Sequence, residues 1–156
     1  VTGPDSLQQL DSPEGIAVDS KGNIFIADWG NHRIIVFRKN GNYLTSIGTR
    51  GINGRNDSGE SISLMLPKRI AVAEDKEGIS YNNTTYGRRS LLFVSDNNGV
   101  HITDIDGNYL DSLPLGTHPP DQIYDVYVTG YGKDLQIYLA DRVKQKILRL
   151  VPDRAQ

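Results

Sequence analysis

Cysteine is absent from this chain of 156 residues. Disulfide bonds and metal sites built on thiolates are therefore excluded. The absence does not identify a compartment, because secreted domains with an adequate core also lack disulfides. Long apolar runs are missing too, and none approaches the ~20 residues that a membrane-spanning helix needs. No signal peptide is recognisable, so we expect a processed N-terminus or a piece of a longer chain.

An excess of charge of either sign is also missing. The chain has 17 basic and 19 acidic residues, which gives a formal net charge of −2. This balance implies no general attraction to nucleic acid or to an anionic membrane. The sequence has no glycine-rich phosphate loop, no nucleophile elbow and no paired helical carboxylates. We therefore expect a non-enzymatic protein without a cofactor, and we do not expect nucleic acid as its partner.

Short runs rich in β-branched and aromatic residues are present instead, separated by Gly, Asn and Asp. Between residues 13 and 48 this pattern predicts four strands, at residues 16–19, 24–28, 33–37 and 43–47. Asn40-Gly41 suits a two-residue hairpin turn between the last two. Four such strands form a sheet of about the size of a propeller blade, which has roughly 40 residues.

The pattern returns twice along the chain. The second repeat covers residues 67–116 and the third covers residues 123–153, while residues 1–12 resemble a connection between blades. Residues 107–113 (GNYLDSL) repeat residues 41–47 (GNYLTSI) almost letter for letter. The third repeat has only three predicted strands. We therefore predict an all-β fold of about three four-stranded antiparallel blades, the last one incomplete.

Three blades do not close a ring, because propellers typically need four to eight. Uncovered strand edges and apolar sheet faces would also favour aggregation. We therefore expect the partners to be further propeller blades, in a longer chain or a homo-oligomer, or another protein. A ring completed by two copies is the second interpretation.

The first repeat resembles an NHL repeat, the blade of NHL-type β-propellers. The residues that carry the resemblance are Pro13, Gly15-Ile16-Ala17-Val18-Asp19, Gly22-Asn23, Ile26-Ala27-Asp28 and Asn31-His32-Arg33-Ile34. The family takes its name from an Asn-His-Leu triplet, whose third position is occupied by Arg33 in this sequence. The resemblance implies a partial NHL-type propeller that serves as a binding or structural module for protein interactions or assembly. It also implies that His32 stabilises the blade.

An aspartate follows the second strand of each repeat, at Asp28, Asp96 and Asp141. Metal ligation is one interpretation of this series. Its repetition once per blade favours a structural role, in which each carboxylate accepts backbone hydrogen bonds within its own tight turn. We predict the structural role for all three.

The turn after Asp28 also contains the only tryptophan, Trp29, beside Asn31-His32-Arg33. Aromatic and Arg side chains are favoured at interaction hot spots. We predict an interaction surface formed by Trp29, Asn31, His32 and Arg33, with Trp29 and Arg33 as an exposed recognition pair. The His32 side chain is expected to bond a neighbouring backbone group.

Two other functions stay open. His32, His101 and His118 would suit a metal-dependent lyase of the peptidylglycine amidating type, an NHL propeller with a histidine-bound metal, but nothing in the sequence shows that they converge. Some NHL propellers of the tripartite-motif class bind RNA on a basic face. The basic residues available for this are Arg88, Arg89, Arg142, Lys144, Lys146 and Arg149. Asp141 and Asp153 interleave with them, so solvated strand edges explain them better.

Three N-x-[ST] patterns make Asn56, Asn82 and Asn83 candidate N-glycosylation sites. The last two lie in residues 74–90, a segment between the first and second strands of the second repeat that is long enough to suggest a purpose. We expect an extracellular, secreted glycoprotein, with glycan as a candidate partner and a cytoplasmic protein as the alternative. The surface segments 29–33 and 74–90 would face the partner.

Overall fold

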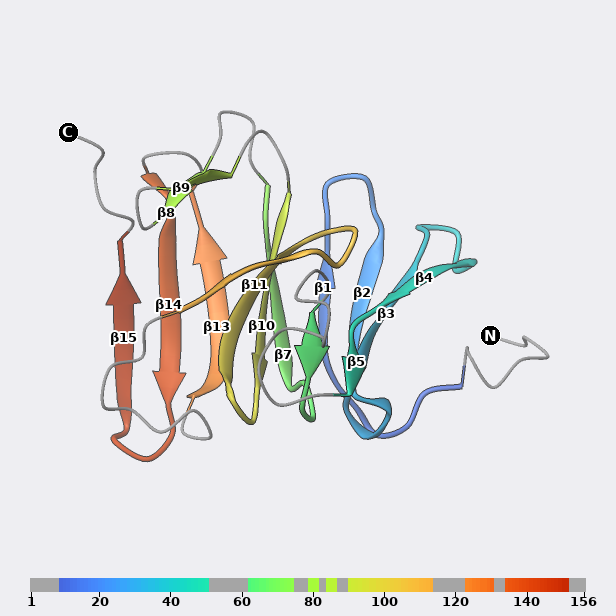
Figure 1. The fold of residues 1–156 in the computed structure, drawn as a ribbon, viewed down its shortest axis with the longest axis horizontal. Helices are drawn as coiled ribbons and strands as arrows, with labels where there is room; N and C mark the ends of the chain where they lie inside the picture. Colours follow the sequence, from blue (N-terminus) through green and yellow to red (C-terminus); the bar gives the residue numbers. More distant parts are fainter. Residues whose placement is uncertain are drawn as a thin grey trace.

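The protein is described here from a computed structural model that covers residues 9–50, 62–74, 79–81, 84–86, 90–113, 123–130 and 134–151. These residues form an all-β fold in which three antiparallel sheets stand side by side in sequence order (Figure 1). Within each sheet the strands pair as consecutive neighbours, apart from one inserted hairpin. None of the helical residues in the described ranges forms a segment long and apolar enough to cross a membrane.

The first sheet contains β1 (Pro13–Val18), β2 (Ile24–Asp28), β3 (Arg33–Phe37) and β4 (Tyr43–Ile47). The bounds of β2, β3 and β4 are those predicted from the sequence. β1 begins earlier than predicted, and a shift of its register between Pro13 and Gly15 marks a bulge at its start.

The predicted two-residue turn at Asn40-Gly41 is wrong, because five residues separate β3 from β4 and three of them lie inside the last backbone pair, Arg38 and Asn42. The Arg38 N–H donates to the Asn42 carbonyl at 2.8 Å, and the Gly41 N–H donates to the Arg38 carbonyl at 2.8 Å. Gly41 ends this loop at a φ of 83°, a backbone conformation that favours glycine. The turns between β1 and β2 and between β11 and β12 close through the same pair of bonds.

The second sheet contains β7 (Arg69–Ala73), β10 (Leu91–Asp96), β11 (Gly99–Asp104) and β12 (Tyr109–Ser112). The long segment between β7 and β10 includes a hairpin of its own, formed by β8 (Ile79–Tyr81) and β9 (Thr84–Tyr86). A short parallel pair, β5 (Thr49–Arg50) and β6 (Ser63–Leu64), lies between the first and second sheets in the sequence.

The third sheet contains β13 (Ile123–Thr129), β14 (Gln136–Asp141) and β15 (Lys146–Leu150). It is a three-stranded sheet, as the sequence predicted for the last repeat.

Two apolar layers hold the sheets together. Phe25, Val36 and Ile47 of the first sheet pack against Leu92 and Val94 of the second. A second cluster joins the other face of the second sheet to the third. The first strands of the sheets also contact one another, β7 with both β1 and β13. Because strand side chains alternate between faces, one sheet contributes to both layers.

Candidate functional site

Asp28 lies at the end of β2 and is fully buried. Its Oδ1 accepts the backbone N–H of Asp11 at 2.7 Å, while Oδ2 accepts hydrogen bonds from Asn31 Nδ2 at 2.9 Å and Arg33 Nε at 2.8 Å. The Gly30 N–H donates back to the Asp11 carbonyl at 2.9 Å. These bonds attach the segment before β1 to the turn after β2.

Asp96 makes the same attachment in the second sheet. Its Oδ2 accepts the Met65 N–H at 2.7 Å, and the Asn97 N–H donates back to the Met65 carbonyl at 3.0 Å. Its Oδ1 accepts the N–H groups of Asn98 at 2.6 Å and Gly99 at 3.1 Å. Met65 therefore takes the place that Asp11 has in the first sheet.

Asp141 is buried at the end of β14, where its Oδ1 accepts the N–H groups of Val143 at 3.0 Å and Lys144 at 2.8 Å. Asp96 and Asp141 thus accept backbone hydrogen bonds in their own turns. Asp28 differs from the prediction, because the groups it binds in its own turn are the Asn31 and Arg33 side chains. Arg33 supplies a positive charge to the fully buried Asp28 carboxylate, which would be costly to bury without a partner.

Arg33 does not form the exposed recognition pair predicted with Trp29. Its side chain is only 11% exposed, because the guanidinium contacts Asp28 and the Gln9 carbonyl, the latter at 3.1 Å. Trp29 is half-buried in the short 3-10 helix η1 (Trp29–Asn31). Asn31 is exposed, but its amide also donates to the Gln9 carbonyl. The chain therefore brings the four predicted residues together in one turn, with the polar groups of Asn31 and Arg33 already bonded.

His32 links the first sheet to the connection that leads into the second. Its backbone has a φ of 56°, in the left-handed region, and its Nδ1 accepts the Leu66 N–H at 3.2 Å. Burial, followed by the positive charge of Arg50, lowers the pKa of His32. A lowered pKa favours the neutral ring, which is the form that accepts a hydrogen bond at Nδ1.

His101 lies in a buried polar relay that the sequence did not predict. Its Nε2 is 3.1 Å from Asp96 Oδ1, its Nδ1 is 2.9 Å from Ser112 Oγ, and Ser112 Oγ is 2.7 Å from the Tyr109 hydroxyl. The only sequence signal for this relay is the repeated Tyr-x-x-Ser of β4 and β12, since Tyr43 and Ser46 make the equivalent contact at 3.2 Å.

The relay contains Ser, His and Asp, but it does not provide the other parts of an acyl-transfer site. Such a site needs free N–H donors beside the nucleophile to stabilise an oxyanion. The Ser112 N–H donates to Asp111 Oδ1 at 2.8 Å, and the Leu113 N–H donates to the Val100 carbonyl at 2.8 Å. Both nearby donors are therefore occupied, and a packing role suits the relay better.

The two described histidines lie in separate environments, His32 at Leu66 and His101 between Asp96 and Ser112. His118 lies outside the described residues. In the part of the chain that the structure covers, no group of three or more His, Cys, Asp or Glu side chains is arranged to hold a metal ion.

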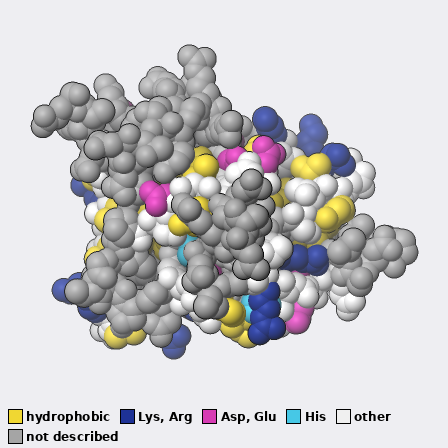
Figure 2. All heavy atoms as spheres, in the orientation of Figure 1, with side chains coloured by type: hydrophobic (Ala, Val, Ile, Leu, Met, Phe, Trp, Pro, Cys, Tyr) yellow, Lys and Arg dark blue, Asp and Glu magenta, His cyan; other side chains and the backbone are white. Residues whose placement is uncertain are grey.

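Basic side chains are exposed along the β14–β15 turn and β15. They are Arg142, Lys144, Lys146 and Arg149. Asp141, expected to interleave with them, is buried instead, so its carboxylate does not lie at the surface among them. Arg88, Arg89 and Asp153 lie outside the described residues. Figure 2 shows that Lys and Arg side chains occupy several separate places on the face it presents.

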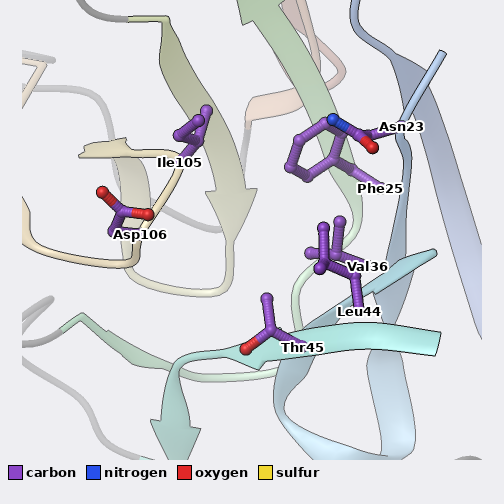
Figure 3. Close-up of a pocket in the computed structure, with 7 residues that line it drawn as sticks. All are labelled: Asn23, Phe25, Val36, Leu44, Thr45, Ile105 and Asp106. Carbon is purple, nitrogen blue, oxygen red and sulfur yellow. The ribbon is translucent and has the colours of Figure 1, made fainter. Parts of the chain in front are cut away.

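A pocket of about 270 Å³ lies between the first and second sheets. It is next to the start of β2, whereas Asp28 is at the other end of this strand. Ile105 and Asp106 face Phe25, Val36 and Leu44 across it (Figure 3). Its volume is below the range of about 300–1,000 Å³ that is usual for drug-sized ligands. The candidate glycosylation sites Asn56, Asn82 and Asn83 lie outside the described residues.

Comparisons with known proteins agree with this geometry. The family model of the NHL repeat matches residues 10–37. The protein called brain tumor from Drosophila melanogaster is 35% identical over 71 residues, which are 46% of this chain and 6% of that protein. Residues 10–37 therefore match the NHL repeat, and the three antiparallel sheets are consistent with blades of a β-propeller.

Proposed function

We propose that this chain is a non-enzymatic protein-interaction module, and that the face of its first sheet on which Ile16 and Val18 are exposed binds another blade-like sheet. The partner sheet would belong to a longer form of the same chain, to a second copy or to another protein. Support comes from a set of positions that recurs in all three sheets.

The strand registers identify these positions. In every sheet, two apolar residues of the first strand lie opposite two apolar residues of the second. In the second and third sheets, these residues lie on the face toward the preceding sheet. The pairs are Ile16–Ile26 and Val18–Ile24 in the first sheet, Ile70–Val94 and Val72–Leu92 in the second, and Val126–Leu139 and Val128–Ile137 in the third.

The same positions differ sharply in burial, and this observation carries the proposal. Ile70 is 6% exposed because it packs against the first sheet, whereas the equivalent Ile16 is 66% exposed. Val18 is 58% exposed as well. Burying one such side chain fully contributes roughly 1.5–3 kcal/mol, so another sheet on this face would gain substantially.

The test is the double variant Ile16→Lys/Val18→Lys in the intact protein, with Val143→Lys as the matched control. Val143 is equally exposed, but it lies in the turn after β14. If the face binds another molecule, the double variant should lower the native mass. If it binds a sheet of the same chain, the melting temperature should fall by several degrees. The proposal fails if neither quantity differs between the double variant and the control.

RNA binding is a second candidate, favoured by the exposed basic residues along β15 and by the burial of Asp141. Clustered positive charge binds phosphates in a salt-dependent manner. Retention on single-stranded RNA should then weaken from 50 to 200 mM salt and be lost in Arg142→Ala/Lys144→Ala. Retention that does not change with salt would contradict this candidate.

A further inference from the structure

The pocket between the first and second sheets combines apolar walls with one carboxylate, that of Asp106. We propose that it holds the side chain of one lysine residue of a protein partner, with the ammonium group at Asp106 and the methylene stem on the apolar walls. This inference rests on the proposed role in protein interaction. It concerns a different surface from the one on which Ile16 and Val18 are exposed.

The apolar walls suit an unbranched aliphatic stem. Phe25 and Val36 are each only 2% exposed, so they present the edge of the core to the pocket. Leu44 is 38% exposed and Ile105 is half-buried, and these two side chains continue the apolar surface toward solvent. Lysine buries its stem along such a surface and keeps its charged end near water.

Asp106 determines the charge of the occupant. Among the described residues that line the pocket, it alone is ionisable, and its side chain is exposed. Within the described ranges no hydrogen bond or ion pair engages its carboxylate. Figure 3 shows Asp106 across the pocket from Val36 and Leu44, with Thr45 between them. The Coulomb interaction with this carboxylate favours a cation over an anion.

The other polar groups of the lining suit a hydrogen-bond donor. The Asn23 amide nitrogen already donates to Asp19 Oδ2 at 2.8 Å, which leaves its Oδ1 to accept. The Thr45 hydroxyl also has lone pairs that accept. An ammonium group carries only donors, and it rotates to meet acceptors on several sides. A guanidinium directs its donors in one plane, so lysine fits this arrangement better than arginine.

Both polar rims of the pocket are held in place before a ligand binds. Asp19 fixes Asn23, because its Oδ1 accepts the Asn23 N–H at 2.7 Å in addition to the amide contact. Asp104 fixes the opposite rim in the same way. It accepts the N–H groups of Asp106 at 3.0 Å and Asn108 at 2.9 Å, and the Asn108 amide at 2.8 Å. The rims therefore lose little conformational freedom when a ligand binds.

The size of the pocket favours a protein as the source of the lysine. A volume of about 270 Å³ is below the range of about 300–1,000 Å³ that is usual for drug-sized ligands, so the pocket holds little more than one side chain. A single side chain makes few contacts. Polypeptide on either side of the lysine adds further contacts at the exposed Leu44, whereas a free amine does not.

The experiment titrates the intact protein with blocked Gly-Gly-X-Gly-Gly peptides, in which X is lysine, norleucine or glutamate. The methyl signals of Leu44 and Ile105 in NMR spectra report binding in the pocket. We expect the lysine peptide to shift both signals. Norleucine has the same stem without the ammonium group, and it should bind about fivefold more weakly, as expected for a solvent-accessible ion pair. The glutamate peptide should leave both signals in place.

Three protein variants separate the charge from the stem. Asp106→Asn should abolish the preference, so that the lysine and norleucine peptides bind equally. Asp134→Asn removes an exposed carboxylate that precedes β14 in the third sheet, and it should retain the preference. Leu44→Ala should weaken both peptides alike, because it removes part of the apolar wall they share.

The results that would overturn the proposal are distinct. A lysine peptide that shifts neither methyl signal would show that the pocket does not bind lysine. A preference for lysine that persists in Asp106→Asn would show that the ammonium group does not lie at Asp106. Tighter binding of n-butylammonium than of the lysine peptide would overturn the protein source.

One further variant keeps this test separate from that of the sheet contact. Ile16→Lys/Val18→Lys should bind the lysine peptide as the wild type does, because neither residue lines the pocket. A failure of the pocket and a failure of the proposed sheet contact would therefore be recognised independently.

Discussion

Leu66 donates its backbone N–H to Nδ1 of His32 across 3.2 Å, between residues that are 34 positions apart in the sequence. The bond joins the turn of one blade to the segment that leads into the next. In that segment the Met65 N–H is bound by Asp96, so consecutive residues are held by two different sheets. The connection between the blades is therefore fixed by side chains from both of them.

Stability should fall on acidification because of His32. Its pKa is lowered in the folded state by burial and then by Arg50, so the unfolded state binds a proton at a higher pH. The contribution is present above the unfolded pKa, and it is lost as pH falls through the folded pKa. We expect the urea midpoint of wild type to decrease from pH 7.5 to 5.5. In His32→Asn, which tolerates the left-handed backbone but does not titrate, this part of the decrease should disappear. An identical decrease in both proteins would contradict the role of His32.

Removing the Asp28 carboxylate should destabilise the protein strongly. Asp28→Ala would leave the largely buried Arg33 guanidinium and the Asp11 N–H without their partner. Breaking a buried ion pair from one side costs about 3–5 kcal/mol, which chemical denaturation would measure. Asp106→Ala is the control, because Asp106 is exposed and its change should stay within about 0.5 kcal/mol. A loss of similar size in both variants would show that the position of Asp28 has no special importance.

Gly15 should not tolerate even a methyl group. A Cβ at this position would collide with the Lys68 carbonyl oxygen and lie 2.9 Å from the Arg69 Cα, both in the backbone of the second blade. We expect Gly15→Ala to cost about 1–3 kcal/mol through overpacking. Gly41→Ala separates sterics from conformation, because a Cβ there meets nothing within 4 Å although φ is 83°. A smaller loss for Gly15→Ala than for Gly41→Ala would contradict the close approach of β1 and β7.

Glycosylation gives a direct test of the expected extracellular location. If Asn56, Asn82 or Asn83 carries glycan, enzymatic removal of N-glycans from protein secreted by eukaryotic cells should lower the intact mass toward 17.3 kDa per copy of this chain. Asn56→Gln and Asn82→Gln/Asn83→Gln would then assign the sites. A mass unaffected by the treatment would contradict glycosylation at all three sites.

The local sequence pattern was sufficient to predict the bounds of most strands of the first sheet. β2, β3 and β4 have the bounds that their β-branched and aromatic runs predicted, because alternation and turn residues act over a few positions. The start of β1 and the length of the β3–β4 loop were wrong. Both depend on a bulge or on a specific turn geometry, which composition alone specifies poorly.

The candidate site was predictable only in part. Asp96 and Asp141 accept backbone hydrogen bonds in their own turns as predicted, since the aspartate recurs at a fixed place in each repeat, whereas Asp28 binds side chains there. The exposed pair of Trp29 and Arg33 was not found, because burial of Arg33 follows from its contacts with Asp28 and Gln9. The relay through His101 and Ser112 was missed, because its partners meet only across paired strands.

The sequence by itself determined that this chain is all-β and built of repeated antiparallel sheets, since the pattern of strands and turns repeats and each strand or turn is specified by a few neighbouring residues. Only the tertiary structure decided which apolar residues are covered. Ile16 and Ile70 occupy equivalent positions in similar strands, yet one is exposed and the other is buried. The difference arises because burial depends on the neighbouring sheet, which no local sequence pattern specifies.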